Sequence, residues 1–280
     1  MKTIGIISLS NGLNIENNLI IDELTTKLNY YNIKVFESNA IYKDYNLTLS
    51  PKIRADELMN LYKNPEIDMI FDVSGGDLAN SVLDYIDFNI IKENPKPFFG
   101  FSDLSVIMNS IYKKTNLNSY WFQLRNIVRD RSNTSLKLIA DYILNDDESI
   151  FDFDYKFLQG TSMSGIVIGG NLRCSLKLSG TEYMPELKDN ILLIESLGGD
   201  INKVTTYLTQ YKHMGAFKDT KGVILGTFTE LEKTLSEEQA AKLILDIIDN
   251  KNLPVIKTQE IGHDCLSKSI SIGKYYNLKA

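Results

Sequence analysis

Histidine and cysteine are scarce in this chain of 280 residues, which contains only two of each. His213 and His263 lie far apart, and Cys174 and Cys265 lack the close spacing of metal-ligand pairs. Zinc and two-metal sites require a cluster of such ligands, so the sequence disfavours metal catalysis and predicts no bound metal. In a chain without an export signal, two reduced and partly buried thiols are favoured over a disulfide.

Long apolar runs are also missing. The first residues, Met1 to Ser8, contain only a short apolar stretch, whereas a signal peptide needs roughly 7–15 apolar residues followed by a small-residue cleavage site. No segment approaches the roughly 20 apolar residues that cross a membrane. We therefore expect a cytoplasmic protein.

The chain likewise has no block of basic residues. Its net charge is −6, and Lys and Arg are interspersed with Asp and Glu along the sequence. Nucleic acids and anionic membrane surfaces attract proteins with a continuous basic face. Both are therefore disfavoured as partners.

What the chain does have is enough length for two domains, since one domain takes roughly 100–200 residues. Through the first half, apolar runs alternate with segments of helical periodicity. This pattern is typical of an α/β fold in which helices cover both faces of a parallel sheet. The expected strands there are 4–8, 33–36, 68–73 and 97–101, and the expected helices are 16–30, 51–62, 78–85 and 104–112.

The pattern changes after residue 133. We predict an N-terminal α/β domain over residues 1–133, a polar and aromatic connection over 134–160, and a C-terminal domain over 161–280. In the C-terminal domain, the expected strands are 165–168, 191–195, 222–227 and 254–257, and the expected helices are 172–178, 201–214 and 236–248.

A candidate nucleophile follows the fourth predicted strand, in the segment Gly100-Phe101-Ser102-Asp103. A turn from a buried strand into a helix can expose a serine hydroxyl and leave the next backbone amide free to hold an oxyanion. The usual hydrolase turn has a second glycine after the serine, and this segment has none. From this segment alone, an ordinary helix N-cap is the favoured interpretation of Ser102.

A glycine pair follows the third predicted strand, in the segment Ser74-Gly75-Gly76-Asp77. Glycines at such a position let the backbone approach a ligand closely, as an oxyanion hole requires. An ordinary tight turn explains the segment equally well. The spacing fits neither a dinucleotide motif nor a P-loop, so no nucleotide cofactor is expected.

The base and its carboxylate have one good candidate each. His263 lies in a loop beside Gly262, whereas His213 lies at the end of a predicted helix, where a capping role suffices. Glu195 ends the apolar run 191–194, and burying a carboxylate there is costly without a partner such as a histidine N–H. A carboxylate that simply emerges into water is the equally weighted alternative. Cys265 lies too near His263 in sequence to act as its nucleophile.

Taken in order, these segments resemble the family of serine peptidases that contains murein tetrapeptide LD-carboxypeptidases and microcin C immunity hydrolases. The resemblance runs through nearly the whole chain. Its most specific parts are the segment 99–105 around Ser102, Gly169-Gly170-Asn171-Leu172 with the later 178–181, the run 191–195, and Gly262-His263 with Ile272-Gly273 downstream.

The resemblance implies a catalytic triad of Ser102, Glu195 and His263. It also implies a parallel α/β domain that carries the serine and a smaller, strand-rich α+β second domain that carries the other two residues. The active site would lie between them, and the oxyanion would be held by the backbone N–H groups of Asp103 and of Gly75 or Gly76.

Two segments depart from the family pattern. Ser74 stands where the family usually has an arginine, Asp77 stands where it has an aromatic residue, and Tyr120-Trp121-Phe122-Gln123 replaces a His-Gly-Pro-like segment. Both segments are expected to line the cleft, so Ser74, Trp121 and Arg125 are the candidate substrate-binding residues. Arg125 is the leading candidate for binding a substrate carboxylate.

These features predict a serine hydrolase that cleaves an amide bond. The favoured activity is removal of the terminal D-alanine from cell-wall tetrapeptides, as in peptidoglycan recycling. The alternatives are an immunity-type hydrolase of aminoacyl-nucleotide antibiotics and a binding protein that has lost turnover. The expected partner is a small peptide or an aminoacyl nucleotide, and a homodimer is left open.

Overall fold

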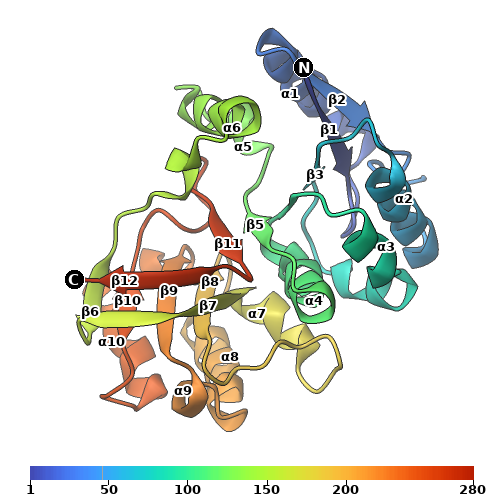
Figure 1. Cartoon of the computed structure of the whole chain (residues 1–280). Coiled ribbons are helices and arrows are strands. Elements are labelled where there is room, and N and C mark those ends of the chain that lie inside the picture. The colour runs from blue at the N-terminus through green and yellow to red at the C-terminus, as the bar shows by residue number, and fades with distance from the viewer. Residues whose placement is uncertain (46) are drawn as a thin grey trace.

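The computed structural model describes residues 1–45 and 47–280. The chain forms two mixed β-sheets, each flanked by helices, and Figure 1 shows the blue-to-green half beside the yellow-to-red half. This arrangement confirms the predicted α/β fold class with a strand-rich second part.

The first sheet has the strand order β11-β5-β4-β3-β1-β2. Its parallel strands come from the N-terminal half, and the two central strands β3 and β4 are completely buried, as in sheets covered by helices on both faces. The parallel strands are β1 (Lys2–Ile7), β2 (Ile33–Glu37), β3 (Met69–Asp72), β4 (Phe98–Gly100) and β5 (Ser119–Trp121).

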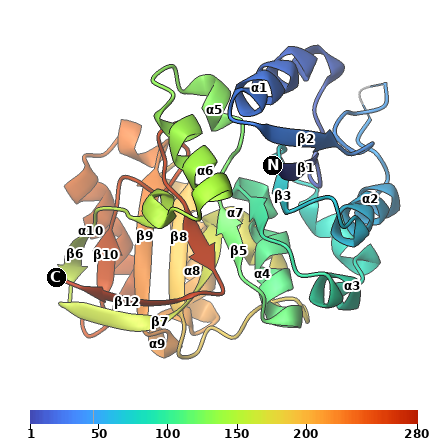
Figure 2. The same cartoon turned by 45° about the horizontal axis from the view of Figure 1, so that its top comes forward.

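Two groups of helices pack on this sheet. Figure 2 shows α1, α5 and α6 together on one side and α2, α3 and α4 on the other. As predicted, Ser50 is the N-cap of α2, because its hydroxyl accepts a hydrogen bond from the Ile53 amide at 3.3 Å and Pro51 opens the helix. The helices are α1 (Asn18–Tyr30), α2 (Pro51–Lys63), α3 (Phe88–Glu93), α4 (Ser105–Thr115), α5 (Asn126–Arg129) and α6 (Thr134–Asn145).

The second sheet has the order β12-β7-β8-β9-β10-β6, with parallel strands β7 to β10 between two antiparallel edge strands. Its strands are β6 (Lys156–Gln159), β7 (Ser162–Asn171), β8 (Ile191–Ser196), β9 (Gly222–Phe228), β10 (Val255–Lys257) and β12 (Tyr275–Lys279). Its helices are α7 (Leu172–Ser175), α8 (Ile201–His213), α9 (Ala216–Asp219) and α10 (Glu237–Ile248), the last with the predicted N-cap Ser236 in a capping box.

Several details differ from the sequence-based expectation. β11 (Ile270–Ile272) comes from the C-terminal half yet pairs antiparallel with β5, at the edge of the first sheet. The expected connection contains β6, which pairs antiparallel with β10. The helix expected at 78–85 is a 3-10 helix, Ala79–Tyr85, followed by α3. Strands of three or four residues are too short to show a periodic pattern, so only their pairing partners define them.

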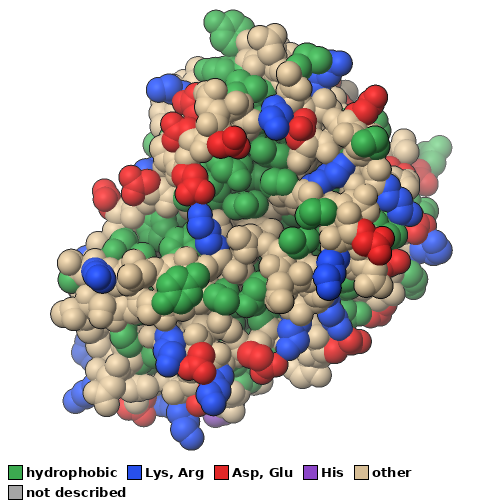
Figure 3. Space-filling view, in the orientation of Figure 1, with side chains coloured by type: hydrophobic (Ala, Val, Ile, Leu, Met, Phe, Trp, Pro, Cys, Tyr) green, Lys and Arg blue, Asp and Glu red, His purple; other side chains and the backbone are tan. Residues whose placement is uncertain are grey.

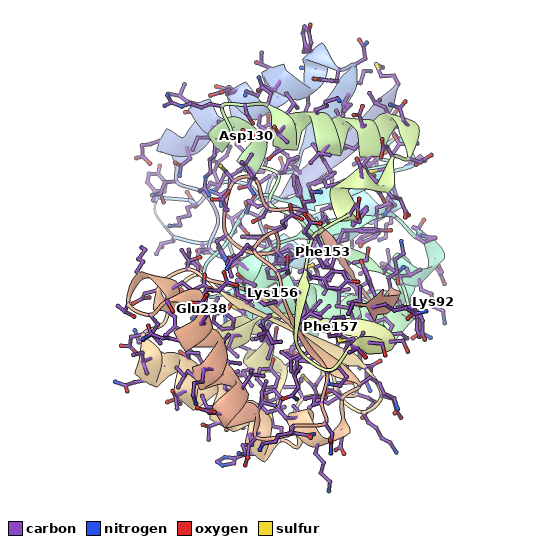
Figure 4. All side chains as sticks on the ribbon, turned by 90° about the vertical axis from the view of Figure 1, so that its left-hand side faces the viewer. Lys92, Asp130, Phe153, Lys156, Phe157 and Glu238 are labelled. Atoms are coloured by element: carbon purple, nitrogen blue, oxygen red, sulfur yellow. The ribbon has the colours of Figure 1, made fainter. Side chains whose placement is uncertain are left out.

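One hydrophobic cluster joins the two halves. It includes Phe101 and Trp121 from the first half and Met163, Leu193 and Ile261 from the second. Phe153 of the connecting stretch belongs to this cluster, and Tyr155 and Phe157 pack against it. Figure 4 labels Phe153 below α6 and Phe157 on β6. The packing therefore fixes the ends of β4 and β8 relative to each other.

The surface carries charges of both signs. On the face shown in Figure 3, acidic and basic side chains are interspersed over both halves. None of the helices in the described ranges is both long and apolar enough to cross a bilayer.

Candidate active site

Ser102 stands directly after β4 in a strained backbone conformation. Its φ is +54°, in the left-handed region that non-glycine residues seldom adopt, and a 3-10 helix from Ser102 to Leu104 leads into α4. Ser105 donates a hydrogen bond to the Ser102 carbonyl at 2.6 Å and thereby supports the turn. Ser102 is not an N-cap, because Phe101 is the N-cap of the 3-10 helix and Leu104 is the N-cap of α4.

Glu195 and His263 form a hydrogen bond. Glu195 lies in β8 and is fully buried, and its Oε2 is 2.7 Å from His263 Nδ1. Asn171, at the end of β7, donates from Nδ2 to the other carboxylate oxygen at 2.8 Å. Both oxygens are thus satisfied, which offsets the cost of burying this carboxylate.

The other ring nitrogen of His263 has no partner. Nε2 is buried and makes no hydrogen bond within the described part of the chain. The ring of Phe101, the residue before Ser102, packs edge-on against the imidazole with centroids 4.5 Å apart. No hydrogen bond joins Ser102 to His263 among the described residues. The contact with the imidazole comes from Phe101, the residue before Ser102. The catalytic roles of the three residues remain predictions.

Two glycines allow this close packing around the acid and the base. A Cβ on Gly262 would lie 1.8 Å from Thr227 Oγ1 and 2.8 Å from Thr227 Cβ. A Cβ on Gly226 would lie 2.8 Å from the Cβ of Glu195 and 2.4 Å from the Ile261 carbonyl. The glycine before His263 is therefore required by the packing of its loop against β9.

We predict that Gly262→Ala destabilises the protein, because the added methyl group has no room beside Thr227. Overpacking of this kind costs about 1–3 kcal/mol, which urea denaturation would measure. Gly75→Ala is the matched control, since a Cβ at Gly75 meets no atom within 4 Å. A Gly262→Ala protein as stable as the Gly75→Ala protein would show that the loop carrying His263 adjusts freely.

The glycine turn presents unused backbone donors. Within residues 1–45 and 47–280, no acceptor is found for the amides of Gly75, Gly76 and Asp103. Gly76 has a φ of +133°, and a Cβ there would lie 2.2 Å from the Asn11 side chain, so only glycine fits. The Asn11 side chain in turn accepts a hydrogen bond from the Asp77 amide at 2.9 Å. These free amides are suited to holding an oxyanion.

A buried ion pair connects this turn to the residue after Ser102. Asp103 is fully buried, and its carboxylate accepts hydrogen bonds from Ser10 Oγ at 2.6 Å, the Ala79 amide at 2.9 Å and Lys177 Nζ at 2.5 Å. Lys177 also donates to the Asp77 carbonyl at 2.8 Å. Lys177 could not be predicted from the sequence, because it lies in the other half of the chain from Asp103.

We predict that Lys177→Met lowers the free energy of unfolding by about 3 kcal/mol, because Asp103 would stay buried without its counter-charge. This is the lower end of the range for broken buried pairs, since Lys177 keeps some contact with water. Chemical denaturation measures the effect. Lys113→Met, which breaks an exposed pair with Glu186, is the control and should cost less than about 1 kcal/mol. Equal losses in the two variants would contradict a structural role for the buried pair.

Ser102 opens into a cavity of about 560 Å³, a size typical of small-ligand sites. Arg173 lines it and pairs with Asp77 at 2.5 Å, while its Nη2 donates to the Gly76 carbonyl at 3.2 Å. The cavity is lined by Gly76, Asp77, Ser102, Asn171, Arg173, Ser196, Leu197, Gly198, Gly199, Lys203, Tyr207 and Glu230. Of the charged residues here, only Asp77 lies in a segment that the sequence marked as a candidate site.

The three predicted substrate-binding residues are not among these lining residues. Trp121 is fully buried beneath Phe101, with ring centroids 5.0 Å apart. Ser74 is buried and donates to Asp72 at 2.6 Å. Arg125 is half-buried beside Gln123, and burial lowers the pKa of its guanidinium to about 10. Burial also raises the pKa of the Asp72 carboxyl to about 6. Gln123, beside Arg125, donates to the Ser74 carbonyl at 3.0 Å and so links this segment to the glycine turn.

No group of three or more His, Cys, Asp or Glu side chains in the described ranges is arranged to hold a metal ion. The reactive groups that the structure does show near Ser102 are the buried pair of Glu195 and His263 and the backbone amides of the glycine turn.

Comparison with known proteins finds relatives of two named kinds. The chain is 27% identical over 246 residues to the microcin C7 self-immunity protein MccF of Escherichia coli. The matched region covers 76% of this chain and 70% of MccF. It is 24% identical over 230 residues to a "probable murein peptide carboxypeptidase" of Bacillus subtilis. That matched region covers 79% of this chain and 71% of the relative.

Solved structures show the same fold. Wild-type MccF without ligand superposes with a TM-score of 0.88 at 23% identity, over 99% of this chain and 93% of that one. A muramoyltetrapeptide carboxypeptidase from Oxalobacter formigenes superposes with a TM-score of 0.82 at 19% identity, over 100% and 95% of the two chains. Residues 4–121 match the LD-carboxypeptidase N-terminal domain, and residues 164–278 match the LD-carboxypeptidase C-terminal domain. The chain therefore belongs to the LD-carboxypeptidase family.

Proposed function

We propose that this protein hydrolyses an amide bond, with Ser102 as nucleophile, His263 as general base and Glu195 as the residue that orients the imidazole. The observation that carries the proposal is the buried hydrogen bond between Glu195 and His263 Nδ1, while Nε2 of the same ring has no partner among residues 1–45 and 47–280. A base held in this way needs only a serine hydroxyl at Nε2 to complete a triad. Ser102 is the candidate, since the adjacent Phe101 already contacts the ring.

The proposed reaction proceeds through an acyl-enzyme. Ser102 Oγ attacks the carbonyl carbon while His263 Nε2 takes the hydroxyl proton, and the oxyanion is held by amides of Asp103 and the glycine turn. His263 then returns the proton to the leaving amine, and water attacks the ester by the same route. The buried Glu195 carboxylate stabilises the imidazolium that forms in each step.

The substrate that we propose is a murein tetrapeptide, from which the terminal D-alanine is released. Family members named as murein peptide and muramoyltetrapeptide carboxypeptidases support this choice. The lining of the cavity also supports this choice. Among the described residues that line it, Tyr207 is the only aromatic one. In the connecting stretch, Phe153 is buried in the core, and Tyr155 and Phe157 pack against the same cluster. A flat nucleobase therefore finds little to stack on.

Hydrolysis of an aminoacyl nucleotide is the competing activity, favoured by the likeness to MccF, whose structure is known with aspartyl sulfamoyl adenosine. One experiment separates the two activities. The protein is incubated with a murein tetrapeptide and, separately, with aspartyl sulfamoyl adenosine, and the products are identified by mass spectrometry. We expect free D-alanine from the tetrapeptide and slower or no cleavage of the adenosine compound. Cleavage of the adenosine compound alone would replace the carboxypeptidase with the immunity-type activity.

A further inference from the structure

The cavity beside Ser102 contains a positive charge that the proposed acyl transfer does not use. Lys203, in the first turn of α8, lines the cavity and is exposed. Its ammonium group makes no ion pair or hydrogen bond with any residue that the structure describes, whereas its backbone amide donates to the N-cap Asp200 at 2.9 Å. This lysine is thus available to a ligand.

The other charges in the cavity already have partners. Asp77 is paired with Arg173 at 2.5 Å, and Glu230 accepts a hydrogen bond from the Gly199 amide at 2.5 Å. Both carboxylates are therefore engaged by the protein itself, while Lys203 is not. The N-terminal end of α8, a helix of 13 residues, adds further positive potential near Lys203.

A carboxypeptidase needs such a charge close to its nucleophile. It cleaves the last amide bond, so the substrate carboxylate is separated from the scissile nitrogen by a single carbon atom. Ser102 and Lys203 share one cavity, and Arg173 adds a guanidinium to the same lining. Arg125, which the sequence suggested for this task, is half-buried and is not a lining residue.

We propose that Lys203, together with Arg173, forms the site that binds the terminal carboxylate of the substrate. The inference rests on the proposed function, in that the anion is taken to be the end of a peptide cleaved by Ser102. Lys203 supplies the unpaired charge. Arg173 contributes its positive charge while it holds Asp77 and the Gly76 carbonyl in place. Lys203 thus determines specificity, and it takes no part in the proton transfers.

The test compares a peptide ending in D-alanine with the same peptide as its C-terminal amide. Losing a hydrogen bond to a charged group costs about 1.5–3 kcal/mol. Lys203→Met should therefore lower kcat/KM on the free acid by about 10- to 150-fold, and on the amide by less than about twofold. Lys203→Arg should restore most of the preference for the acid. Lys212→Met is the matched control, since it removes the same charge from the same helix outside this cavity. Equal losses on both peptides would overturn the proposal.

A binding measurement separates this inference from the proposed function. Calorimetry on the Ser102→Ala protein gives the affinity for each peptide without turnover. Suppose that the wild type cleaves neither peptide, that Ser102→Ala binds the acid more tightly than the amide, and that Lys203→Met abolishes this difference. Such a result would support the carboxylate site and contradict the proposed function. If the wild type cleaves the peptide, but the acid and the amide bind with equal affinity and Lys203→Met changes neither affinity, the carboxylate site is wrong and the proposed function is supported. Absence of both binding and cleavage overturns both.

Discussion

Replacing Ser102 with Ala is expected to reduce kcat on the murein tetrapeptide by about 10⁴- to 10⁶-fold, because the members of a triad act as a unit. The residual rate would come from the oxyanion donors and from substrate binding. Steady-state kinetics with product detection measures the loss, and circular dichroism establishes that the fold is intact. An Ser102→Ala enzyme that keeps most of its activity would rule out this serine as the nucleophile.

The backbone at Ser102 provides a matched control. A residue with a side chain pays roughly 1–2 kcal/mol to adopt left-handed φ, and Ser102 has a φ of +54°. Ser102→Gly should therefore be as inactive as Ser102→Ala but more stable in thermal denaturation. Greater stability together with lost activity would show that the backbone at this turn is strained in the wild type and that activity requires the serine hydroxyl. If Ser102→Gly is less stable than the wild type, the strain argument is wrong.

His263→Ala should lose about as much activity as Ser102→Ala. Glu195→Gln is expected to lower kcat by about 10⁴-fold, which is the second loss and is the one seen when a triad acid becomes an amide. The reason for the second loss lies in Asn171. Its Nδ2 donates to Glu195 Oε1, so a glutamine must place its carbonyl there and turn its NH₂ toward His263 Nδ1. The imidazole would then carry its proton on Nε2 and could not accept one from serine.

The pH dependence of kcat and the ¹⁵N chemical shifts of the imidazole would report this change of tautomer directly. His213→Ala is the control, since His213 is exposed at the end of α8 and should leave kcat unchanged. A Glu195→Gln protein with near wild-type kcat would mean that the carboxylate does not set the tautomer. Loss of activity in His213→Ala would mean that the wrong histidine has been assigned.

The order of strands and helices could be predicted from the sequence, because their signals are local. Fully apolar runs such as 191–194 indicate buried parallel strands, and Ser50-Pro51 and Ser236 are helix starts that need no tertiary contact to be recognised. The membership of the LD-carboxypeptidase family was also predictable, since its motifs follow one another along the chain. The candidates Ser102, Glu195 and His263 came from those same motifs.

The substrate side of the site could not be predicted in this way. Trp121 and Ser74 stand in segments that depart from the family, yet both are buried. Trp121 packs against Phe101, and Ser74 donates a hydrogen bond to Asp72. Whether a polar or aromatic residue lines a cavity or supports it from beneath depends on neighbours that are distant in sequence.

The sequence by itself determined the fold class, the family and the segments that carry the candidate triad, because each depends on residues close together in the chain. Only the tertiary structure decided which charges meet. It paired Lys177 with Asp103 and Arg173 with Asp77, and among the described residues it gave the Lys203 ammonium group no partner. These pairs join residues more than 70 positions apart. The physical reason is that electrostatic partners are selected by distance in space, which the packing of the two sheets sets and local sequence does not.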